Sequence, residues 1–128
     1  MAASTLVGLG LVTGVAVAPA SATAGISCSG KSEGMCVYRD AGFTPPYAWF
    51  AKPTNVPWFG NWDYYTTTTT VNDSITSASN LSYSCTAYVY RDINYGTPVV
   101  AFGPRLVLSN FGGSAVGNDA ASSLYWTC

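Results

Sequence analysis

The sequence predicts an all-β domain, and three observations carry that prediction. Beyond residue 25 no stretch keeps a helical period, because Pro, Gly, Asn and Ser interrupt every apolar run within about ten residues. Tyr, Val, Thr, Trp and Phe fill the runs between these breaks, which is the composition of short strands. Two sequence blocks also recur in the same order, which indicates an internal duplication. Together these features favour a sandwich or barrel.

The first 24 residues are interpreted as an export segment. Leu6 to Ala18 is apolar, and two small-residue cleavage options follow it, Ala20-Ser21-Ala22 and Ala22-Thr23-Ala24. This order is typical of a secretory signal peptide, although no Lys or Arg precedes the apolar run. A transmembrane anchor is the alternative, but it needs about 20 unbroken apolar residues. We therefore expect a signal peptide at 1–24 and a secreted, extracellular domain at 25–128, with no membrane association after cleavage.

Short runs rich in Val, Tyr, Phe, Trp and Leu are expected to form the strands of this domain. Turn-forming Gly, Pro, Asn or Asp separates each run from the next. The expected strands are Met35 to Arg39, Tyr47 to Ala51, Ala87 to Arg91, Val99 to Phe102, Arg105 to Leu108 and Ser123 to Trp126.

The duplication is visible in two pairs of blocks. Val37-Tyr38-Arg39-Asp40 recurs as Val89-Tyr90-Arg91-Asp92, an offset of 52 residues. Asn72-Asp73-Ser74-Ile75-Thr76-Ser77 recurs as Asn118-Asp119-Ala120-Ala121-Ser122-Ser123, an offset of 46 residues. The first copy therefore carries about six extra residues between its blocks.

Two copies of about 50 residues, each with short strands, suggest a specific architecture. We expect a first copy at about 28–80 and a second at about 85–128. Each would form a Greek key, and the two would pack around a pseudo-two-fold axis. The extra residues of the first copy fall in or near Pro57 to Thr70, which is rich in aromatic residues and threonine.

The charge balance excludes several functions. Charged residues make up 9% of the chain, with five Lys+Arg, six Asp+Glu and no His, for a net charge of -1. No basic surface exists for nucleic acid, and the missing histidine excludes Ser-His-Asp catalysis and His-ligated zinc. Catalysis by a carboxylate pair is the remaining route. Only Asp40 and Asp92 are related by the repeat, and turn capping or pairing with the preceding arginines is their simpler role. We therefore expect no enzymatic activity.

Four cysteines in an exported chain indicate disulfides rather than a metal cluster. They allow three connectivities. Cys28 and Cys36 lie close in sequence and Cys128 is the last residue, so we expect Cys28 with Cys36 and Cys85 with Cys128.

The repeated Asn-Asp blocks place short oxygen-bearing side chains along one tight loop in each copy. Oxygen is the ligand that Ca²⁺ requires, with backbone carbonyls and water completing the shell. Each block offers one carboxylate, Asp73 or Asp119, which predicts weak binding of about micromolar to millimolar affinity. The alternative is that these residues form Asx-turns without any metal. Their recurrence after matching strand blocks favours the metal.

With these blocks the chain resembles the microbial βγ-crystallins. The blocks Asn72-Asp73-x-x-Thr76-Ser77 and Asn118-Asp119-x-x-Ser122-Ser123 look like their paired calcium motif. Tyr38-x4-Phe43 and Tyr90-x4-Tyr95-Gly96 look like their folded-hairpin signature. The resemblance spans roughly residues 28 to 126 and implies a sandwich of two Greek keys that binds up to two Ca²⁺ ions.

The resemblance also implies a ligand set. One site would use Asn72, the Ser74 carbonyl and the Ser122 hydroxyl. The other would use Asn118, the Ala120 carbonyl and the Thr76 hydroxyl. Backbone near Asp40 and Asp92 would add ligands, and the crossed hydroxyls would tie the two copies together.

One departure from the family concerns the hairpins. The family usually has Gly two positions after the second aromatic residue, where a positive φ is wanted. This chain has Pro45 and Thr97 there. Because proline cannot adopt a positive φ, the first hairpin is expected to differ from the second.

The opening Cys28 to Cys36 followed by Val37-Tyr38 further resembles secreted bacterial crystallin-like proteins that are peptidase inhibitors, some of them acting on metallopeptidases. The insertion from Pro57 to Thr70 is the first candidate for the surface that meets a peptidase, because exposed aromatic residues form binding hot spots. Aromatic strands that face the core are the alternative. The candidate residues are Trp58, Phe59, Trp62, Tyr64 and Tyr65.

The expected function is therefore that of a secreted, non-enzymatic, monomeric calcium-binding module that inhibits an extracellular peptidase. A carbohydrate or cell-wall binding module is the first alternative, with sugar rings stacked on Trp49, Trp58, Trp62 and Trp126. A growth inhibitor of the killer-toxin type is the second, since the same fold supports it.

Overall fold

A computed structural model describes residues 28, 31 and 33–128 of the chain, so the expected signal peptide at 1–24 lies outside the described residues. The strands are β1 Gly34–Asp40, β2 Thr44–Ala51, β3 Ser77–Asn80, β4 Thr86–Asp92, β5 Gly96–Phe102, β6 Val107–Leu108 and β7 Ser123–Thr127. Three short 3-10 helices join them, η3 Phe59–Asn61, η4 Ile93–Tyr95 and η5 Phe111–Gly113. Over the described part of the chain, no helix has the length and apolar character needed to span a bilayer.

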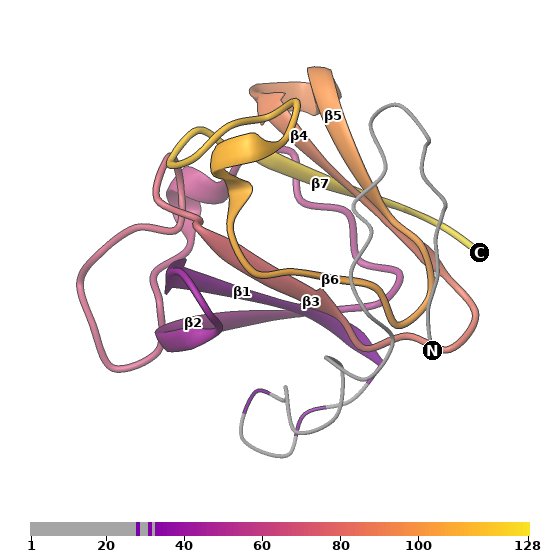
Figure 1. Cartoon of the computed structure of the whole chain (residues 1–128), viewed down its shortest axis with the longest axis horizontal. Helices are drawn as coiled ribbons and strands as arrows, with labels where there is room; N and C mark the ends of the chain where they lie inside the picture. The colour runs from indigo at the N-terminus through magenta and orange to yellow at the C-terminus, as the bar shows by residue number, and fades with distance from the viewer. Residues whose placement is uncertain (1–27, 29–30, 32) are drawn as a thin grey trace.

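The strands form two antiparallel sheets that face each other as layers (Figure 1). One sheet has the order β2-β1-β3-β6 and the other β5-β4-β7. The first sheet thus takes three strands from the first copy and β6 from the second. The predicted all-β sandwich is confirmed, although β3 was not among the expected strands.

An isolated β-bridge between Val56 and Leu124 completes the symmetry of this arrangement. It corresponds to the pairing of Leu108 with Ala78 in the first sheet, because positions 56 and 108 are separated by the 52-residue offset and positions 78 and 124 by the 46-residue offset. Each copy therefore extends its third segment onto the sheet of the other copy. The two halves are interlocked rather than merely stacked.

The core lies between the two sheets. Alternate residues of the central strands point inward, such as Met35 and Val37 in β1 and Ala87 and Val89 in β4. This alternation is what a half-buried strand requires. Phe59 and Phe111, which are also related by the 52-residue offset, fill the space between the layers. Burial of each large apolar side chain stabilises the fold by about 1.5–3 kcal/mol.

The two folded hairpins have the same geometry. Positive φ angles occur at Gly42 and Phe43 in the first hairpin and at Asn94 and Tyr95 in the second. The left-handed residues are thus the second aromatic and the residue before it, so Pro45 is not required to adopt that conformation. The expectation that the first hairpin differs is therefore wrong.

A serine hydroxyl fixes each hairpin over its sheet. Ser77 Oγ accepts the Phe43 N–H at 3.0 Å and donates to the Asp40 carbonyl at 2.6 Å. Ser123 Oγ accepts the Tyr95 N–H at 3.1 Å and donates to the Asp92 carbonyl at 2.7 Å. The last serine of each repeated block therefore has a structural role, and both serines are fully buried.

Both expected disulfides are present, Cys28–Cys36 and Cys85–Cys128, and they account for all four cysteines. The first covers the outer face of the first sheet, where Cys28, Cys36, Tyr38 and Leu81 form a small second core. The second fastens the residue before β4 to the residue after β7.

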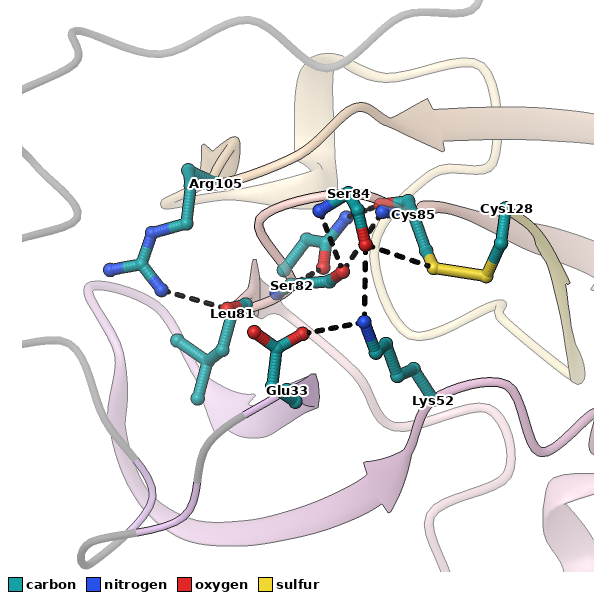
Figure 2. Close-up of polar contacts among 9 residues, drawn as sticks. Glu33, Lys52, Leu81, Ser82, Ser84, Cys85, Arg105 and Cys128 are labelled. Atoms are coloured by element: carbon teal, nitrogen blue, oxygen red, sulfur yellow. Dashed lines mark hydrogen bonds and ion pairs between the residues drawn. A yellow bond between two sulfur atoms is a disulfide. The ribbon is translucent and has the colours of Figure 1, made fainter.

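The connection between the copies, residues 81–85, is held by the polar cluster in Figure 2. Lys52 Nζ lies 2.9 Å from Glu33 Oε1 and donates to Ser84 Oγ at 3.1 Å. This lysine lowers the pKa of Glu33, mainly through its hydrogen bond. Arg105 donates to the Leu81 carbonyl at 2.8 Å. These contacts join both copies to the connection, so the relative position of the copies is fixed at this end of the molecule.

Candidate calcium site

The two repeated loops, Asn72–Ser77 and Asn118–Ser123, lie against each other between the copies. The Asp73 N–H donates to the Ala121 carbonyl at 3.0 Å, and the Asp119 N–H donates to the Ile75 carbonyl at 3.2 Å. Asp73 and Asp119 both have φ 55°, a left-handed conformation that aspartate tolerates better than most residues. The matching conformations give the loops matching shapes.

The hydroxyl groups of these loops cross from one copy to the other. Ser122 Oγ donates to Asp73 Oδ1 at 3.3 Å. Thr76 Oγ1 donates to Asp119 Oδ1 at 3.3 Å. Both hydroxyl-bearing residues are buried. The hydroxyl of each copy therefore contacts the aspartate of the other copy's loop.

An open cleft of about 680 Å³ lies beside the first of these crossings. Its lining residues are Asn72, Asp73, Arg91, Asp92, Ile93, Asp119, Ala120 and Ser122. Three carboxylates and one guanidinium belong to this set, which leaves the cleft acidic. The cleft brings Asn72 and Ser122 together as expected, but with Ala120 in place of Ser74.

The donor set of the cleft fits a hard cation. Asn72 Oδ1 is buried and finds no hydrogen-bond partner among the described residues. A buried acceptor without a partner is costly, and a bound cation would satisfy it. In the described part of the chain, no group of three His, Cys, Asp or Glu side chains could hold a metal. An ion here would therefore have at most two carboxylate ligands and would take its other ligands from amide, hydroxyl and carbonyl oxygens, which is the composition of a weak calcium site.

Asp40 and Asp92 offer backbone rather than side-chain oxygens. Each of their carbonyls accepts one serine hydroxyl, from Ser77 or Ser123, and a carbonyl has a second lone pair. The Asp40 carboxylate lies 3.4 Å from Arg39 Nε, and both side chains are largely exposed. Thr76 lies beside the first hairpin, since its N–H donates to the Tyr38 carbonyl at 2.9 Å, and the second ion is expected there by pseudo-symmetry with the cleft.

The aromatic segment, residues 57–70, combines core and surface positions. Phe59 and Tyr64 are buried, so the expectation that they contact a partner is corrected. Trp58, Trp62 and Tyr65 are 44%, 46% and 41% exposed and form the accessible part of the segment. Their exposure keeps them as candidates for partner contact.

Tyr64 is the residue of this segment that reaches the repeated loops. Its hydroxyl lies 2.9 Å from Ser74 Oγ. Burial, together with smaller effects of nearby charges including Asp119 and Asp40, raises the pKa of Tyr64 to about 12. The phenol therefore stays protonated at neutral pH. Sequence patterns did not indicate this contact.

Two other tryptophans lie away from this surface. Trp126 is buried in the main core, so its proposed stacking on sugar rings is corrected. Trp49 is half-buried on the outer face of the first sheet, with Lys31 Nζ 5.1 Å from its ring centroid. Of the expected set of four, Trp58 and Trp62 are exposed, Trp49 is half-buried, and only Trp126 is buried.

Comparison with known proteins decides the family. The signature described as peptidase inhibitor family I36 matches residues 22–102, more than half of the chain. The chain belongs to peptidase inhibitor family I36. A comparison with curated proteins gives no match for this I36 protein.

Solved structures similar to this I36 protein are βγ-crystallin domains. One, from "Evolution of the eye lens beta-gamma-crystallin domain fold", has a TM-score of 0.63 at 16% identity and covers 80% of this chain and 93% of its own. A βγ-crystallin from Ciona intestinalis has a TM-score of 0.58 at 18% identity and covers 73% and 99%. One from an archaeon has a TM-score of 0.58 at 23% identity and covers 76% and 100%. The likeness confirms the βγ-crystallin fold for this chain.

Proposed function

We propose that this I36 protein is a secreted, non-enzymatic and monomeric module that binds Ca²⁺ at its paired loops and inhibits an extracellular peptidase. The observation that carries the calcium proposal is the buried Oδ1 of Asn72, which has no hydrogen-bond partner within the described residues and lies at a cleft where hydroxyls of each copy reach the other copy. Two disulfides suit an oxidising environment outside the cell.

Calcium at these loops would act on stability as well as on local shape. Because the ligands come from both copies, an ion would bind the folded domain and not the unfolded chain. At a calcium concentration 100 times Kd, the gain is about 2.7 kcal/mol. Residues Asn72, Ser122 and the Asp92 backbone would hold the ion beside the cleft, and Asn118, Thr76 and the Asp40 backbone the pseudo-symmetric one.

Isothermal titration calorimetry with CaCl₂ tests this proposal. We expect up to two weak sites, with Asp73→Ala and Asp119→Ala each impairing one. Asp63→Ala is the matched control, since this exposed aspartate lies outside the repeated loops. Flat heats together with a melting temperature that millimolar calcium leaves unchanged would refute calcium binding.

The inhibitor proposal rests on membership of family I36 and on the exposed aromatic side chains. Two disulfides keep the domain rigid, so little conformational entropy is lost when it docks. Buried aromatic anchors typically dominate such interfaces.

A panel of thermolysin-like and serine peptidases, assayed with and without calcium, tests inhibition. We expect Trp62→Ala to weaken inhibition at least tenfold, whereas Tyr83→Ala, which removes a ring that is 72% exposed in the connection between the copies, leaves it unchanged. Equal inhibition by the two variants would contradict the assignment of the surface, and no inhibition of any peptidase would contradict the function.

Carbohydrate binding is the second candidate, favoured by the exposed rings of Trp58, Trp62 and Tyr65. Aromatic faces bind sugar rings by stacking without any need for charge. Tryptophan fluorescence titration with soluble polysaccharides would show saturable quenching that Trp62→Ala removes. A flat titration, beside positive peptidase inhibition, would decide for the first function.

A further inference from the structure

The aromatic segment leads directly into the first repeated loop. Asp63 and Thr70 form a β-bridge, and the Val71 N–H donates to the Trp62 carbonyl at 2.8 Å. The Tyr64 N–H donates to the Thr69 carbonyl at 3.1 Å. The hairpin therefore closes at the residue immediately before Asn72, and a change in the path of the loop reaches the hairpin base first.

Ser74 joins the loop to this hairpin through its side chain. Its hydroxyl lies 2.8 Å from the Thr70 carbonyl and 2.9 Å from the Val71 carbonyl, with a contact to Tyr64 Oη at 2.9 Å. Because the serine hydroxyl has one hydrogen, it donates to the carbonyls and accepts from Tyr64. Tyr64 is 1% exposed, and Ser74 is the hydrogen-bond partner of its hydroxyl.

The exposed rings take their position from the same segment. Trp62 packs edge-on against Phe50 with ring centroids 5.4 Å apart, and Tyr65 packs against Tyr47 at 5.1 Å. The Tyr65 N–H also donates to the Tyr47 carbonyl at 2.9 Å. Tyr64 thus sits between the loop on one side and the two exposed rings that flank it in sequence.

The second copy has no such connection. Ala120 stands where the first copy has Ser74, so no hydroxyl is present at the third position of the second loop. Ser114, in the segment before that loop, instead donates to the carbonyl of its own 3-10 helix at Phe111, at 2.8 Å. The contact of a phenol with the repeated loop is therefore a feature of the first copy.

We propose that the Tyr64–Ser74 hydrogen bond couples the first repeated loop to the aromatic segment, so that calcium sets the order of the exposed Trp62 and Tyr65. The coupling rests on the proposed calcium binding and peptidase recognition, and it adds regulation of the docking surface by the ion. Linkage is reciprocal, so a partner that holds the segment ordered raises the affinity for calcium by the same factor. Tyr64 is a positioning residue, because it is buried and acts through its contact with Ser74.

Hydrogen exchange of the full chain with and without CaCl₂ tests the coupling, beside calorimetry on the same samples. In the wild type we expect calcium to slow exchange at residues 62–71 and at both repeated loops. In Tyr64→Phe, which keeps the ring but lacks the hydroxyl, calcium still gives heat and still protects 118–123, but the slowing at 62–71 falls at least fivefold. Ser74→Ala should behave like Tyr64→Phe, and Tyr83→Phe like the wild type. Calcium protection of 62–71 that is the same in Tyr64→Phe as in the wild type overturns the coupling.

Failure of the calcium proposal gives a different result. If the wild type gives no calcium heat, that proposal fails, and the coupling is then judged without the ion. Loss of the Tyr64 hydroxyl must still speed exchange at residues 72–77 at least fivefold relative to Tyr83→Phe, because the hydroxyl lies 2.9 Å from Ser74 Oγ and holds the loop by this contact. Unchanged exchange there would overturn the coupling by itself.

Discussion

Replacing the serine that holds each folded hairpin, Ser77→Ala or Ser123→Ala, should destabilise the domain by similar amounts. Each hydroxyl makes two hydrogen bonds, and the corresponding distances in the two copies differ by 0.1 Å: 3.0 and 3.1 Å to the amides, 2.6 and 2.7 Å to the carbonyls. A hydrogen bond contributes about 0.5–1.5 kcal/mol net, so each variant should lose about 1–3 kcal/mol. Because the geometry is the same, the two losses should agree within about 0.5 kcal/mol.

Ser79→Ala is the matched control for this pair. Ser79 lies on β3 two residues after Ser77 and is equally buried, but its hydroxyl has no partner among the described residues. Its removal should be neutral or slightly stabilising, because an unpaired buried hydroxyl is itself unfavourable.

Urea denaturation followed by circular dichroism gives the free energies of unfolding. In thermal melts, the melting temperature should fall by about 4–8 °C for each kcal/mol of stability lost in a domain of this size. A loss below about 0.5 kcal/mol in Ser77→Ala, or an equal loss in Ser79→Ala, would refute the role assigned to the hydroxyl.

Three further variants test other parts of the fold. Asn80→Ala should lower the free energy of unfolding, measured by urea denaturation, by about 3 kcal/mol. The buried side chain donates hydrogen bonds to the carbonyls of residues 85, 102 and 103 and accepts one from the N–H of residue 82. A loss below about 1 kcal/mol would contradict this role. Removing Cys85–Cys128, whose cysteines are 43 residues apart, should cost about 4 kcal/mol, and removing Cys28–Cys36, with a separation of 8, about 2.6 kcal/mol; the reverse order would argue against a chain-entropy origin. Lys52 lowers the pKa of Glu33 in the folded state. The contribution of this pair to the stability of the fold is therefore present above the ordinary glutamate pKa of about 4.3, and it is lost as the pH falls below that value and through the lowered pKa. Urea midpoints between about pH 3 and 6 should therefore fall less steeply with acidification in Lys52→Met than in the wild type. Parallel curves would show that this ion pair does not contribute to the pH dependence of stability.

Much of the fold was predictable because the duplication fixes which segments correspond. The strand missed by composition, β3, has the sequence Ser-Ala-Ser-Asn and is buried at all four positions. Small polar residues have low strand propensity, and the strand exists because β1 pairs with it and because Ser77 and Asn80 bond neighbouring loops. Propensity along one segment does not contain these tertiary contacts.

The candidate site also combines features that could be predicted from the sequence with features that depend on tertiary contacts. The crossing of hydroxyls between the copies was implied by the resemblance of the duplicated motif to the calcium motif of βγ-crystallins, and the structure pairs Ser122 with Asp73 and Thr76 with Asp119. The inward turn of Tyr64 does not, since alternation in a threonine-rich hairpin leaves open which aromatic rings face the core. Proline at position 45 was misleading for a related reason, because the left-handed residues of the hairpin are those before it, Gly42 and Phe43.

The exchanged third segments also bear on how such a domain could arise. A polypeptide with one copy alone would lack the neighbour that β6 supplies to β3, and its own third segment would have no sheet to join. Two separate single-copy chains could form a symmetric dimer in which each chain adds its third segment to the sheet of the other. The present chain has the arrangement that such a dimer would have if its two chains were joined into one, and the joining allows the two halves to carry different sequences, as at the aromatic segment of the first copy.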